Sequence, residues 1–533
     1  MPTSDSRRWW ALVAIAVSVL VVGLDLTVLS LALPTLSRQL HASTSDLQWF
    51  SDAYSLVIAA MVLPAGLLGD RLGRKKVLLA ALLLFGASSA FCALSTSAGE
   101  LIGGRALLGL GAAAIMPLSL SVLPVLFTPE ERPKAIALMA SATFISFPVG
   151  PLLGGWLLDN FWWGSVFLIN VPIVALALVA VAFLMPESRS QQRPRLDVPG
   201  VLISGLGLTA LTYGFIKAGE DGWADTASLA TIVAGVAVLG LFVAWERRVH
   251  GRGGQPLVDL SLFRSASFTW GTLLSTLVTF ALFGILFAMP LYFQDVRGVN
   301  ALGSGLRLLP MIGGMVVGMI GGSRLQSPRR GPDGQPAGSV VSVKALVTAG
   351  YLVMATGLAI GTLTRVSTGT GFTAAWFAVA GLGLGLAMPA AMNAAISPLS
   401  ADRSASGTAL ITAMRQVGGT IGVAVLGTVI SDAYRNALHL SGLPAAAARA
   451  VRSSIGEAVQ VAHAAHATAL LGSVRGAYTH GLDIMLWVCA AIALACALLA
   501  LAFLPRRLTG AAQPAASGDV AAPAGARRGQ WGR

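Results

Sequence analysis

The sequence is organised around the stretch Gly66-Leu67-Leu68-Gly69-Asp70-Arg71-Leu72-Gly73-Arg74-Lys75-Lys76. An apolar run from Trp49 to Leu68 leads into it, and a second run from Val77 to Leu94 follows it. Each run is long enough to cross a bilayer as a helix, so the short basic link predicts a tight hairpin whose turn lies in the cytoplasm. Basic residues alone are typical of any cytoplasmic hairpin, whereas the three glycines also let two helix ends approach closely.

The charges of this hairpin can make contacts that form and break. Asp70 can accept hydrogen bonds from a neighbouring helix N-terminus, and the cations can bind helix C-termini or acidic partners. The pattern Gly66-x-x-x-Asp70-Arg71-x-Gly73-Arg74-Lys75 resembles the loop between helices 2 and 3 of the major facilitator superfamily. The resemblance implies a conformational latch made of Gly66, Asp70, Arg71, Gly73 and Arg74.

The composition is that of a polytopic membrane protein. The chain has 533 residues, of which 55% are hydrophobic and 11% are charged, whereas about a quarter of the residues of a soluble protein are charged. Arg7 and Arg8 precede an apolar stretch from Trp9 to about Leu33, which is too long for a signal-peptide core, so we expect a retained first helix. The formal net charge of +13 lies in alternate loops, as membrane orientation requires, and gives no reason to expect nucleic acid as a partner.

Fourteen apolar runs have the length of a membrane span, which predicts an all-α membrane protein with 14 transmembrane helices. We expect them at 10–33, 49–69, 77–97, 103–126, 135–157, 163–185, 198–217, 226–245, 268–293, 304–323, 343–364, 372–396, 406–430 and 481–504. Alternate loops are rich in cations, and this bias, together with the even number of spans, places both termini in the cytoplasm. We therefore predict a multi-pass protein of the cytoplasmic membrane.

An internal repeat divides the chain. Leu110–Pro117 in the fourth span resembles Leu382–Pro389 in the twelfth, 272 residues later. The same offset relates Gly150 to Gly422 and Gly155 to Gly427. A duplicated six-helix half is the plan of transporters with parallel repeats.

We accordingly expect five parts. They are an N-terminal six-helix bundle (1–196), two inserted helices (197–250), a C-terminal six-helix bundle (251–508), a long loop within it (432–478) and a disordered cytoplasmic tail (509–533). The alanine-rich segment 432–478 is either partly helical on the membrane surface or a loose loop, and the sequence leaves both readings open.

Asp25 is the main candidate for a functional acid. It lies ~22 Å along the first helix from its cytoplasmic end, where a carboxylate must be paired, protonated or hydrated. It could couple protons to transport, or it could only brace helices 1 and 4. The segment from Leu24 to Pro34 resembles the first-helix motif of fourteen-helix drug:proton antiporters, although Ser30 stands where that family commonly has Asn.

Arg105 lies near the level of Asp25, ~7 Å below the start of the fourth helix. An Arg–Asp pair there would satisfy both charges, and the alternative is an arginine that snorkels to the outer surface. Leu101-x-x-x-Arg105-x-x-Leu108-Gly109-x-Gly111 resembles the superfamily's helix 4 motif, with Leu108 in place of the usual Gln. The resemblance implies a role in proton transfer for Arg105.

The fifth helix carries Gly150-Pro151-Leu152-Leu153-Gly154-Gly155, which resembles the motif associated with antiporters. Small residues allow close helix packing, and proline frees a backbone carbonyl. The motif's first glycine is Ser146 in this chain. We expect Gly150, Pro151, Gly154 and Gly155 to form a close helix contact that seals or opens a path.

Candidate substrate contacts lie further along the chain. Arg415 lies ~15 Å into the thirteenth helix, where a cation must face a cavity or a partner. The spans from the ninth to the twelfth contain no midplane acid, which favours neutral, weakly acidic or singly charged amphipathic substrates over dications. We place Arg415, Phe144, Phe147, Phe287 and Met388 on the substrate path.

The resemblance covers about 500 residues and implies a proton-coupled antiporter that exports hydrophobic or amphipathic drugs or antibiotics by alternating access, with Asp25 and Arg105 as the proton-coupling pair. The alternative is a facilitator or importer of a lipid-like or small metabolite. A phosphate-binding G-x-x-x-x-G-K-[ST] loop is absent from the sequence, and its histidines show no metal-like pairing with acids of the kind that a membrane enzyme would need. We expect a monomer in contact with membrane lipid, with no metal and no cofactor, driven by the proton gradient.

Overall fold

The computed structural model describes residues 5–128, 130–189, 197–254, 256–326, 328–330, 336–339, 341–399, 401–438, 440 and 443–505. Fourteen helices in these ranges are long and apolar enough to cross a membrane. They are α1 (Asp5–Gln39), α2 (Thr44–Leu72), α3 (Arg74–Ala93), α4 (Ala98–Ser121), α6 (Arg132–Asn160), α8 (Asn170–Leu184), α9 (Val198–Asp221), α10 (Thr226–Gly251), α11 (Ala266–Leu291), α12 (Ala301–Gln326), α13 (Val343–Gly361), α14 (Thr370–Ile396), α15 (Ala401–Ala437) and α18 (Thr468–Phe503).

The remaining elements are short. They are α5 (Leu123–Leu126), α7 (Ser165–Leu168), the 3₁₀ turn η1 (Leu260–Arg264), the π-helical turn η2 (Tyr292–Val296), β1 (Pro328–Arg330), β2 (Pro336–Ser339), α16 (Ala445–Ser453) and α17 (Ile455–Ala464). The π-helical turn continues α11, and β1 and β2 form a small antiparallel hairpin. The predicted tail at 509–533 lies outside the described residues.

The predicted helical membrane fold and the number of spans are confirmed. Apolar runs of about 20 residues must form helices in lipid, because a helix satisfies its own backbone hydrogen bonds. Capping side chains fix where several helices begin. The Ser43 hydroxyl accepts from the Asp46 amide at the start of α2, and the Ser97 hydroxyl accepts from the Glu100 amide at the start of α4. Two helices are longer than hydropathy predicts, since α15 continues to Ala437 and α18 already begins at Thr468.

The helices pack as two similar bundles. In the N-terminal half (α1–α8), α1 packs on α6, α4 lies between α2 and α3, and α3 contacts α8. In the C-terminal half (α11–α18), the same pairs recur: α11 packs on α15, α14 lies between α12 and α13, and α13 contacts α18. The inserted helices α9 and α10 pack on each other, and α9 also contacts α2 and α15.

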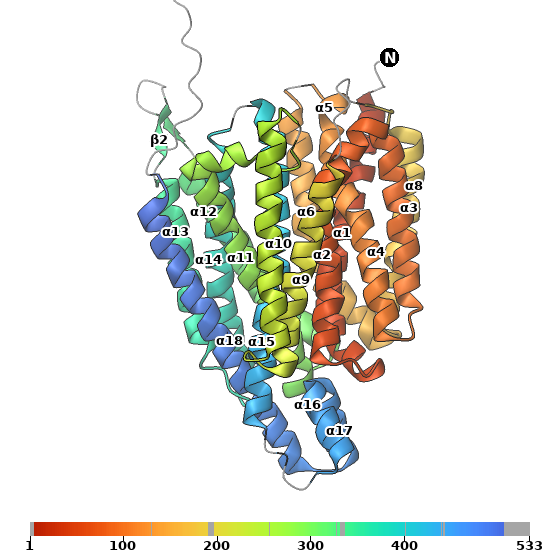
Figure 1. Cartoon of the computed structure of the whole chain (residues 1–533), viewed down its shortest axis with the longest axis vertical. Coiled ribbons are helices and arrows are strands. Elements are labelled where there is room, and N and C mark those ends of the chain that lie inside the picture. The colour runs from red at the N-terminus through yellow and green to blue at the C-terminus, as the bar shows by residue number, and fades with distance from the viewer. Residues whose placement is uncertain are drawn as a thin grey trace, which may run out of the picture.

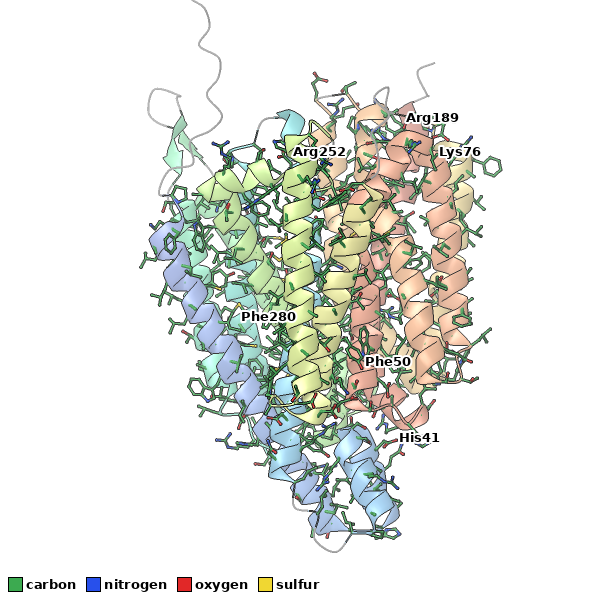
Figure 2. All side chains as sticks on the ribbon, viewed as in Figure 1. His41, Phe50, Lys76, Arg189, Arg252 and Phe280 are labelled. Atoms are coloured by element: carbon green, nitrogen blue, oxygen red, sulfur yellow. The ribbon has the colours of Figure 1, made fainter. Side chains whose placement is uncertain are left out.

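The two ends of the bundle differ (Figure 1). α16 and α17 project from one end, which we call the distal end. α1 begins at the opposite end, which we call the terminal end, and Lys76, Arg189 and Arg252 lie there while His41 lies at the distal end (Figure 2). The loose-loop reading of 432–478 is wrong for the described residues, because this segment contains α16, α17 and the extended ends of α15 and α18.

Candidate functional site

A buried charge pair connects α1 to α4 within the N-terminal half. The Nη1 of Arg105 donates to Oδ2 of Asp25, and the side chains of Arg105 and Asp25 are 0% and 2% exposed. The Nε of Arg105 donates to the backbone carbonyl of Phe50 in α2 at 2.9 Å, and the guanidinium carbon lies 4.4 Å from the centre of the Tyr54 ring. Because both charges are removed from water, each depends on the other for its stability.

Asn170 at the start of α8 completes this polar cluster. Its Nδ2 donates to Oδ1 of Asp25 at 3.4 Å and to Oγ of Ser89 in α3 at 3.1 Å. The Ser89 hydroxyl in turn donates to the carbonyl of Phe167 at 2.8 Å. The cluster therefore involves every long helix of the N-terminal half except α6.

Asp25 is closed off from solvent in this conformation. Its hydrogen-bond partners, Arg105 and Asn170, both belong to the N-terminal half. The resemblance implied alternating access with Asp25 in the proton-coupling pair. With Asp25 buried inside one half, its exposure requires the pair with Arg105 to rearrange.

A second buried acid was missed by sequence reasoning. Asp52 in α2 is 0% exposed, and neither carboxylate oxygen has a hydrogen-bond partner within the described part of the chain. It lies one helical turn after Gln48, on the face of α2 that Gln48 presents to α15. A buried carboxyl without a donor is stable only when it holds its own proton or binds water. The sequence signal was present, since Asp52 interrupts the apolar run of the second span.

The polar contacts of the hairpin that suggested a latch lie within its own half, as far as the described residues extend. Arg74 pairs with Asp70 at 2.8 Å and donates through Nη1 to the carbonyl of Ser121, at the last residue of α4, at 2.9 Å. Its backbone amide donates to the carbonyl of Ser188 at 3.0 Å. Arg74 therefore joins the α2–α3 turn to two segments at the terminal end of the bundle. They are the end of α4 and the chain that follows α8.

Glycine is required at Gly73 for two reasons. Its φ of +119° is a conformation that other residues rarely adopt, and a Cβ there would lie 2.7 Å from Oε1 of Glu187. Gly69 packs equally closely, since its Cβ would meet Leu118 of α4 at 2.0 Å, whereas Gly66 has Pro117 as its nearest neighbour at 3.7 Å. Arg71 is exposed.

The glycines of the fifth span hold α6 against two helices. A Cβ at Gly150 would lie 1.9 Å from Oγ1 of Thr27, and one at Gly154 would lie 2.8 Å from the Val28 side chain, so both positions bring α6 onto α1. Gly155 faces the other half, because its Cβ would lie 2.6 Å from Cα of Leu302 in α12. Gly305 of α12 approaches the Pro151 carbonyl in the same way, with a Cβ distance of 2.4 Å.

The C-terminal half repeats this arrangement. A Cβ at Gly422 of α15 would lie 2.3 Å from the carbonyl of Phe280 in α11, within the same half. A Cβ at Gly427 would lie 2.4 Å from Nε2 of Gln48 in α2, across the halves. Gln48 donates there to the carbonyls of Val423 and Ala424 at 3.2 and 2.9 Å. The repeat seen in the sequence thus corresponds to equivalent contacts in space.

Further polar contacts join the halves at the distal end. Asp159, near the end of α6, accepts from the backbone amides of Ala301 and Leu302 at 3.0 and 3.1 Å, and so caps the start of α12. Gln294 donates to the carbonyl of Leu31 at 2.9 Å. These contacts close the distal end in this conformation.

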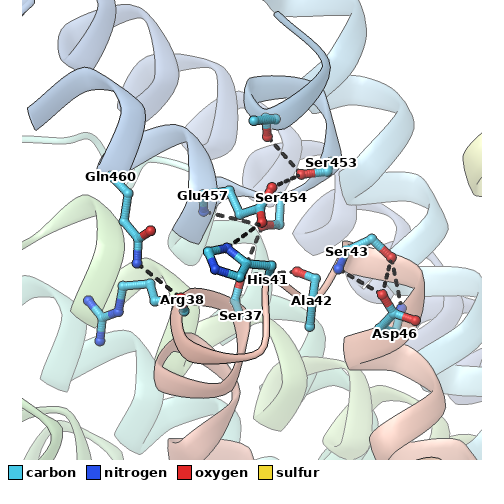
Figure 3. A network of polar contacts seen from close by, with 11 residues as sticks. Ser37, Arg38, His41, Ala42, Ser43, Asp46, Ser453, Ser454, Glu457 and Gln460 are labelled. Atoms are coloured by element: carbon cyan, nitrogen blue, oxygen red, sulfur yellow. Dashed lines mark hydrogen bonds and ion pairs between the residues drawn. The ribbon is translucent and has the colours of Figure 1, made fainter. Parts of the chain in front are cut away.

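The helical pair α16–α17 covers the same end (Figure 3). It is connected to α15 and α18 of the C-terminal half, yet it binds the turn between α1 and α2 of the N-terminal half. The hydroxyls of Ser37 and Ser454 are 2.8 Å apart, and the Thr44 hydroxyl donates to the carbonyl of Ser453 at 3.0 Å. Nδ1 of His41 lies 3.3 Å from Oε1 of Glu457. We call α16–α17 the distal strap, because opening this end must break its contacts.

Two of the predicted substrate contacts come together in the C-terminal half. Arg415 donates through Nε to the Thr279 hydroxyl at 3.2 Å, and its terminal nitrogens lie 3.7 Å from Sδ of Met392 and 3.8 Å from Sδ of Met388. All these partners are neutral, and Arg415 is only half-buried. Its charge is therefore left for a ligand or for water.

The predicted aromatic contacts do not lie together: two are in the middle of α6 and one is near the distal end of α11. Phe144 is 36% exposed and lies eleven residues before Gly155 on α6, on the face that Gly155 presents to α12, because eleven residues make about three helical turns. Phe147 is partly buried against the core. Phe287 is 3% exposed and lies beside a distal crevice of about 10 Å³, far too small for a substrate. The structure therefore does not bring Phe287 together with Arg415 and Phe144 on one open path.

Comparison with known proteins identifies the family. A family model described as the Major Facilitator Superfamily matches residues 15–423. The chain belongs to this superfamily.

Curated relatives of this facilitator are resistance and export proteins. The tetracenomycin C resistance and export protein of Streptomyces glaucescens is 32% identical over 508 residues, covering 93% of this chain and 91% of the relative. The multidrug efflux pump LfrA of Mycolicibacterium smegmatis is 34% identical and covers 93% and 96%. The puromycin resistance protein pur8 of Streptomyces alboniger is 33% identical and covers 80% and 83%.

Solved structures agree on the fold. A bacterial homologue of the human lysosomal transporter Spinster, solved in an inward-facing and unoccupied conformation, matches this facilitator with a TM-score of 0.66 at 16% identity, covering 94% of this chain and 98% of that one. A D-xylose–proton symporter matches with a TM-score of 0.58 at 15% identity, covering 93% and 95%.

Proposed function

We propose that this protein exports an amphipathic drug or antibiotic across the cytoplasmic membrane in exchange for protons. Relatives that share about a third of its residues over nearly the whole chain are named for resistance, efflux and export. The basic hairpin at the terminal end supports a cytoplasmic location for that end and for both chain termini. The distal end would then face the outside.

Alternating access accounts for the way the halves meet. Close glycine contacts and hydrogen bonds join them at the distal end, through Gly155, Gly427 and Asp159. Phe144, on the same face of α6 but nearer the terminal end, is exposed. Such a conformation receives substrate from the cytoplasm, and export follows when the distal contacts separate and the terminal ends close.

The observation that carries the coupling is the buried pair of Asp25 and Arg105. A proton on Asp25 removes the charge that holds Arg105, and Arg105 also binds the Phe50 carbonyl of α2. Protonation therefore changes contacts among α1, α2 and α4 together. Since α2 contacts α15 of the other half through Gln48, a shift of α2 is transmitted to the contacts that close the distal end.

The surroundings of Arg415 indicate the kind of substrate. Its guanidinium is flanked by the thioethers of Met388 and Met392, which are polarisable and adapt to ligands of different shape. A free cation there disfavours dications and favours neutral, weakly acidic or singly charged molecules with an apolar body. We propose that a monomer carries out the cycle with no cofactor.

Transport into proteoliposomes tests this function. Purified protein is reconstituted with an imposed pH gradient, and puromycin uptake is compared between the wild type and Asp25→Asn. We expect the variant to lose gradient-driven uptake while it still exchanges labelled for unlabelled puromycin without a gradient. Unchanged gradient-driven uptake in Asp25→Asn would remove Asp25 from the mechanism.

One further measurement distinguishes a proton-coupled exporter from the alternative, a facilitator or importer on the same fold. In cells preloaded with puromycin, a protonophore that collapses the proton gradient stops a proton-coupled exporter. A facilitator instead continues to equilibrate puromycin under the same treatment.

A further inference from the structure

A cavity of about 440 Å³ lies at the distal end, where the tip of the α9–α10 pair meets α15 and α18. Polar side chains line one part of it, namely Asp432, Asn436 and His480, and Trp223 from the α9–α10 turn also borders it. Val429 and Val488 belong to its apolar wall. A volume of this size suits a small organic ligand.

Asp432 is the distinctive group of this cavity. It is half-buried, and no side chain or backbone group of the described chain forms a hydrogen bond or an ion pair with its carboxylate. Two other acids near the distal end are paired: Asp221 with Lys217 at 2.7 Å, and Asp483 with Arg365 at 3.0 Å. Asp432 thus lies in the cavity wall without an ion-pair or hydrogen-bond partner among the described residues, and His480 is the other titratable side chain of the lining.

The nearest arginine along α15 directs its hydrogen bonds elsewhere. Arg435 donates through Nη1 to the carbonyls of Gly219 and Glu220 at the end of α9, the first at 2.8 Å, and through Nε to the carbonyl of Arg452 at 3.3 Å. These bonds hold its guanidinium at the junction of α9 and α16. Arg435 is also outside the residues that line the cavity.

The lining selects a cation with an apolar body. A carboxylate without an ion-pair partner attracts a positive charge, and the face of an indole ring, such as that of Trp223, also stabilises an ammonium group. The valine side chains favour an apolar portion that leaves water. A tryptophan at the end of two membrane helices is also typical of the membrane–water interface, where amphipathic molecules gather.

We propose that this cavity binds an amphipathic ammonium compound at the distal membrane interface, with its cation at Asp432 and Trp223 and its apolar part against Val429 and Val488. Two sources have this chemistry: an aminophospholipid of the surrounding bilayer, and an organic cation from solution. The site is separate from the Asp25–Arg105 cluster, and its existence does not depend on the direction or the energy source of transport.

Protection of an introduced cysteine tests the site in the full-length protein. Asn436 is exposed and lines the cavity, whereas the native cysteines Cys92, Cys489 and Cys496 are buried. Asn436→Cys protein in phosphatidylglycerol nanodiscs is labelled with a maleimide, with and without benzyltrimethylammonium, and benzyl alcohol serves as the neutral comparison. Labelling slows about fivefold when the cation is at about four times its dissociation constant, because only a fifth of the cavities stay open.

Second substitutions separate binding from other effects. Asp432→Asn abolishes the protection, whereas Asp221→Asn, which removes a nearby acid outside the cavity, preserves it. If phosphatidylethanolamine added to the nanodisc slows labelling by itself and removes the effect of benzyltrimethylammonium, the lipid is the occupant. If the added lipid changes neither the labelling rate nor the protection, the soluble cation is the occupant. Equal labelling rates with the cation, the lipid and neither, or protection that survives Asp432→Asn, would overturn the proposal.

Discussion

Gly155 of α6 and Gly427 of α15 stand at equivalent positions of the two halves, and each is where its helix touches the opposite half. The neighbours differ in kind. Gly155 faces the backbone of Leu302, whereas Gly427 faces the end of the Gln48 side chain. A backbone cannot move aside as a flexible side chain can, so the contact at Gly155 is the less tolerant of the two.

Gly155→Leu is expected to hold the distal end open. The added side chain cannot fit against Leu302 and Ala301, so the halves separate there and export stops. Electron paramagnetic resonance distances between spin labels on the distal ends of α6 and α12 would increase. Gly103→Leu is the matched control, because no atom lies within 4 Å of a Cβ built at Gly103. Wild-type distances and transport in Gly155→Leu would refute the assigned contact.

Arg105→Met is expected to destabilise the protein, and Asp25→Asn in the same chain to restore much of the loss. Removing one partner of a buried pair leaves the other charge uncompensated, at a cost of roughly 3–5 kcal/mol. The double variant leaves no unpaired charge at this site. Thermal unfolding in detergent, followed for both single variants and the double variant, measures the coupling. Additive losses in the double variant would mean that the two residues do not act as a pair.

The helix count and the buried pair could be predicted because their signals are local. Membrane spans follow from hydropathy over about 20 residues, and the depths of Asp25 and Arg105 follow from the rise of a helix. The offset of 272 residues that links Gly155 to Gly427 was also visible in the sequence. The sequence could not show that Gly155 and Gly427 join the two halves, because a glycine does not indicate which helix packs against it.

The contacts that close the distal end had no comparable signal. Gln48, Ser37 and Ser454 are neutral residues whose partners are far apart in sequence. The distal strap is made of helices too short to span a membrane, so hydropathy leaves that segment undecided between helix and loop. Asp52 was overlooked because a single acid near the start of an apolar run is also typical of a helix boundary.

Asp52→Asn is expected to leave thermal stability unchanged or to raise it. The described residues offer its carboxylate no donor, so a neutral amide of the same size removes a poorly satisfied acid. Asp25→Asn acts in the opposite direction, because Arg105 then loses its charged partner. Unfolding temperatures of the two variants, measured side by side, separate the roles of these acids. A clear loss of stability in Asp52→Asn would show that the carboxylate has a structural partner.

Arg74→Ala is expected to loosen the terminal ends of α2 and α4 without unfolding the bundle. The substitution removes the ion pair with Asp70 and the hydrogen bond to the Ser121 carbonyl, which are partly exposed and worth about 1 kcal/mol each. Hydrogen exchange should rise in the α2–α3 turn and at the end of α4. Arg71→Ala, at an exposed position of the same turn, should change little. Equal exchange in both variants would mean that Arg74 does not organise this turn.

Ser37→Cys combined with Ser454→Cys is expected to lock the distal strap onto the N-terminal half. The two hydroxyl oxygens are 2.8 Å apart, so a disulfide between the replacing cysteines needs little movement. If the distal end must open for export, oxidation abolishes puromycin transport in proteoliposomes and a reductant restores it. The single variants are the controls, and they should transport under both conditions because Cys92, Cys489 and Cys496 are buried and unpaired. Full transport by the oxidised double variant, with the crosslink verified by mass spectrometry, would show that the halves do not separate at this strap.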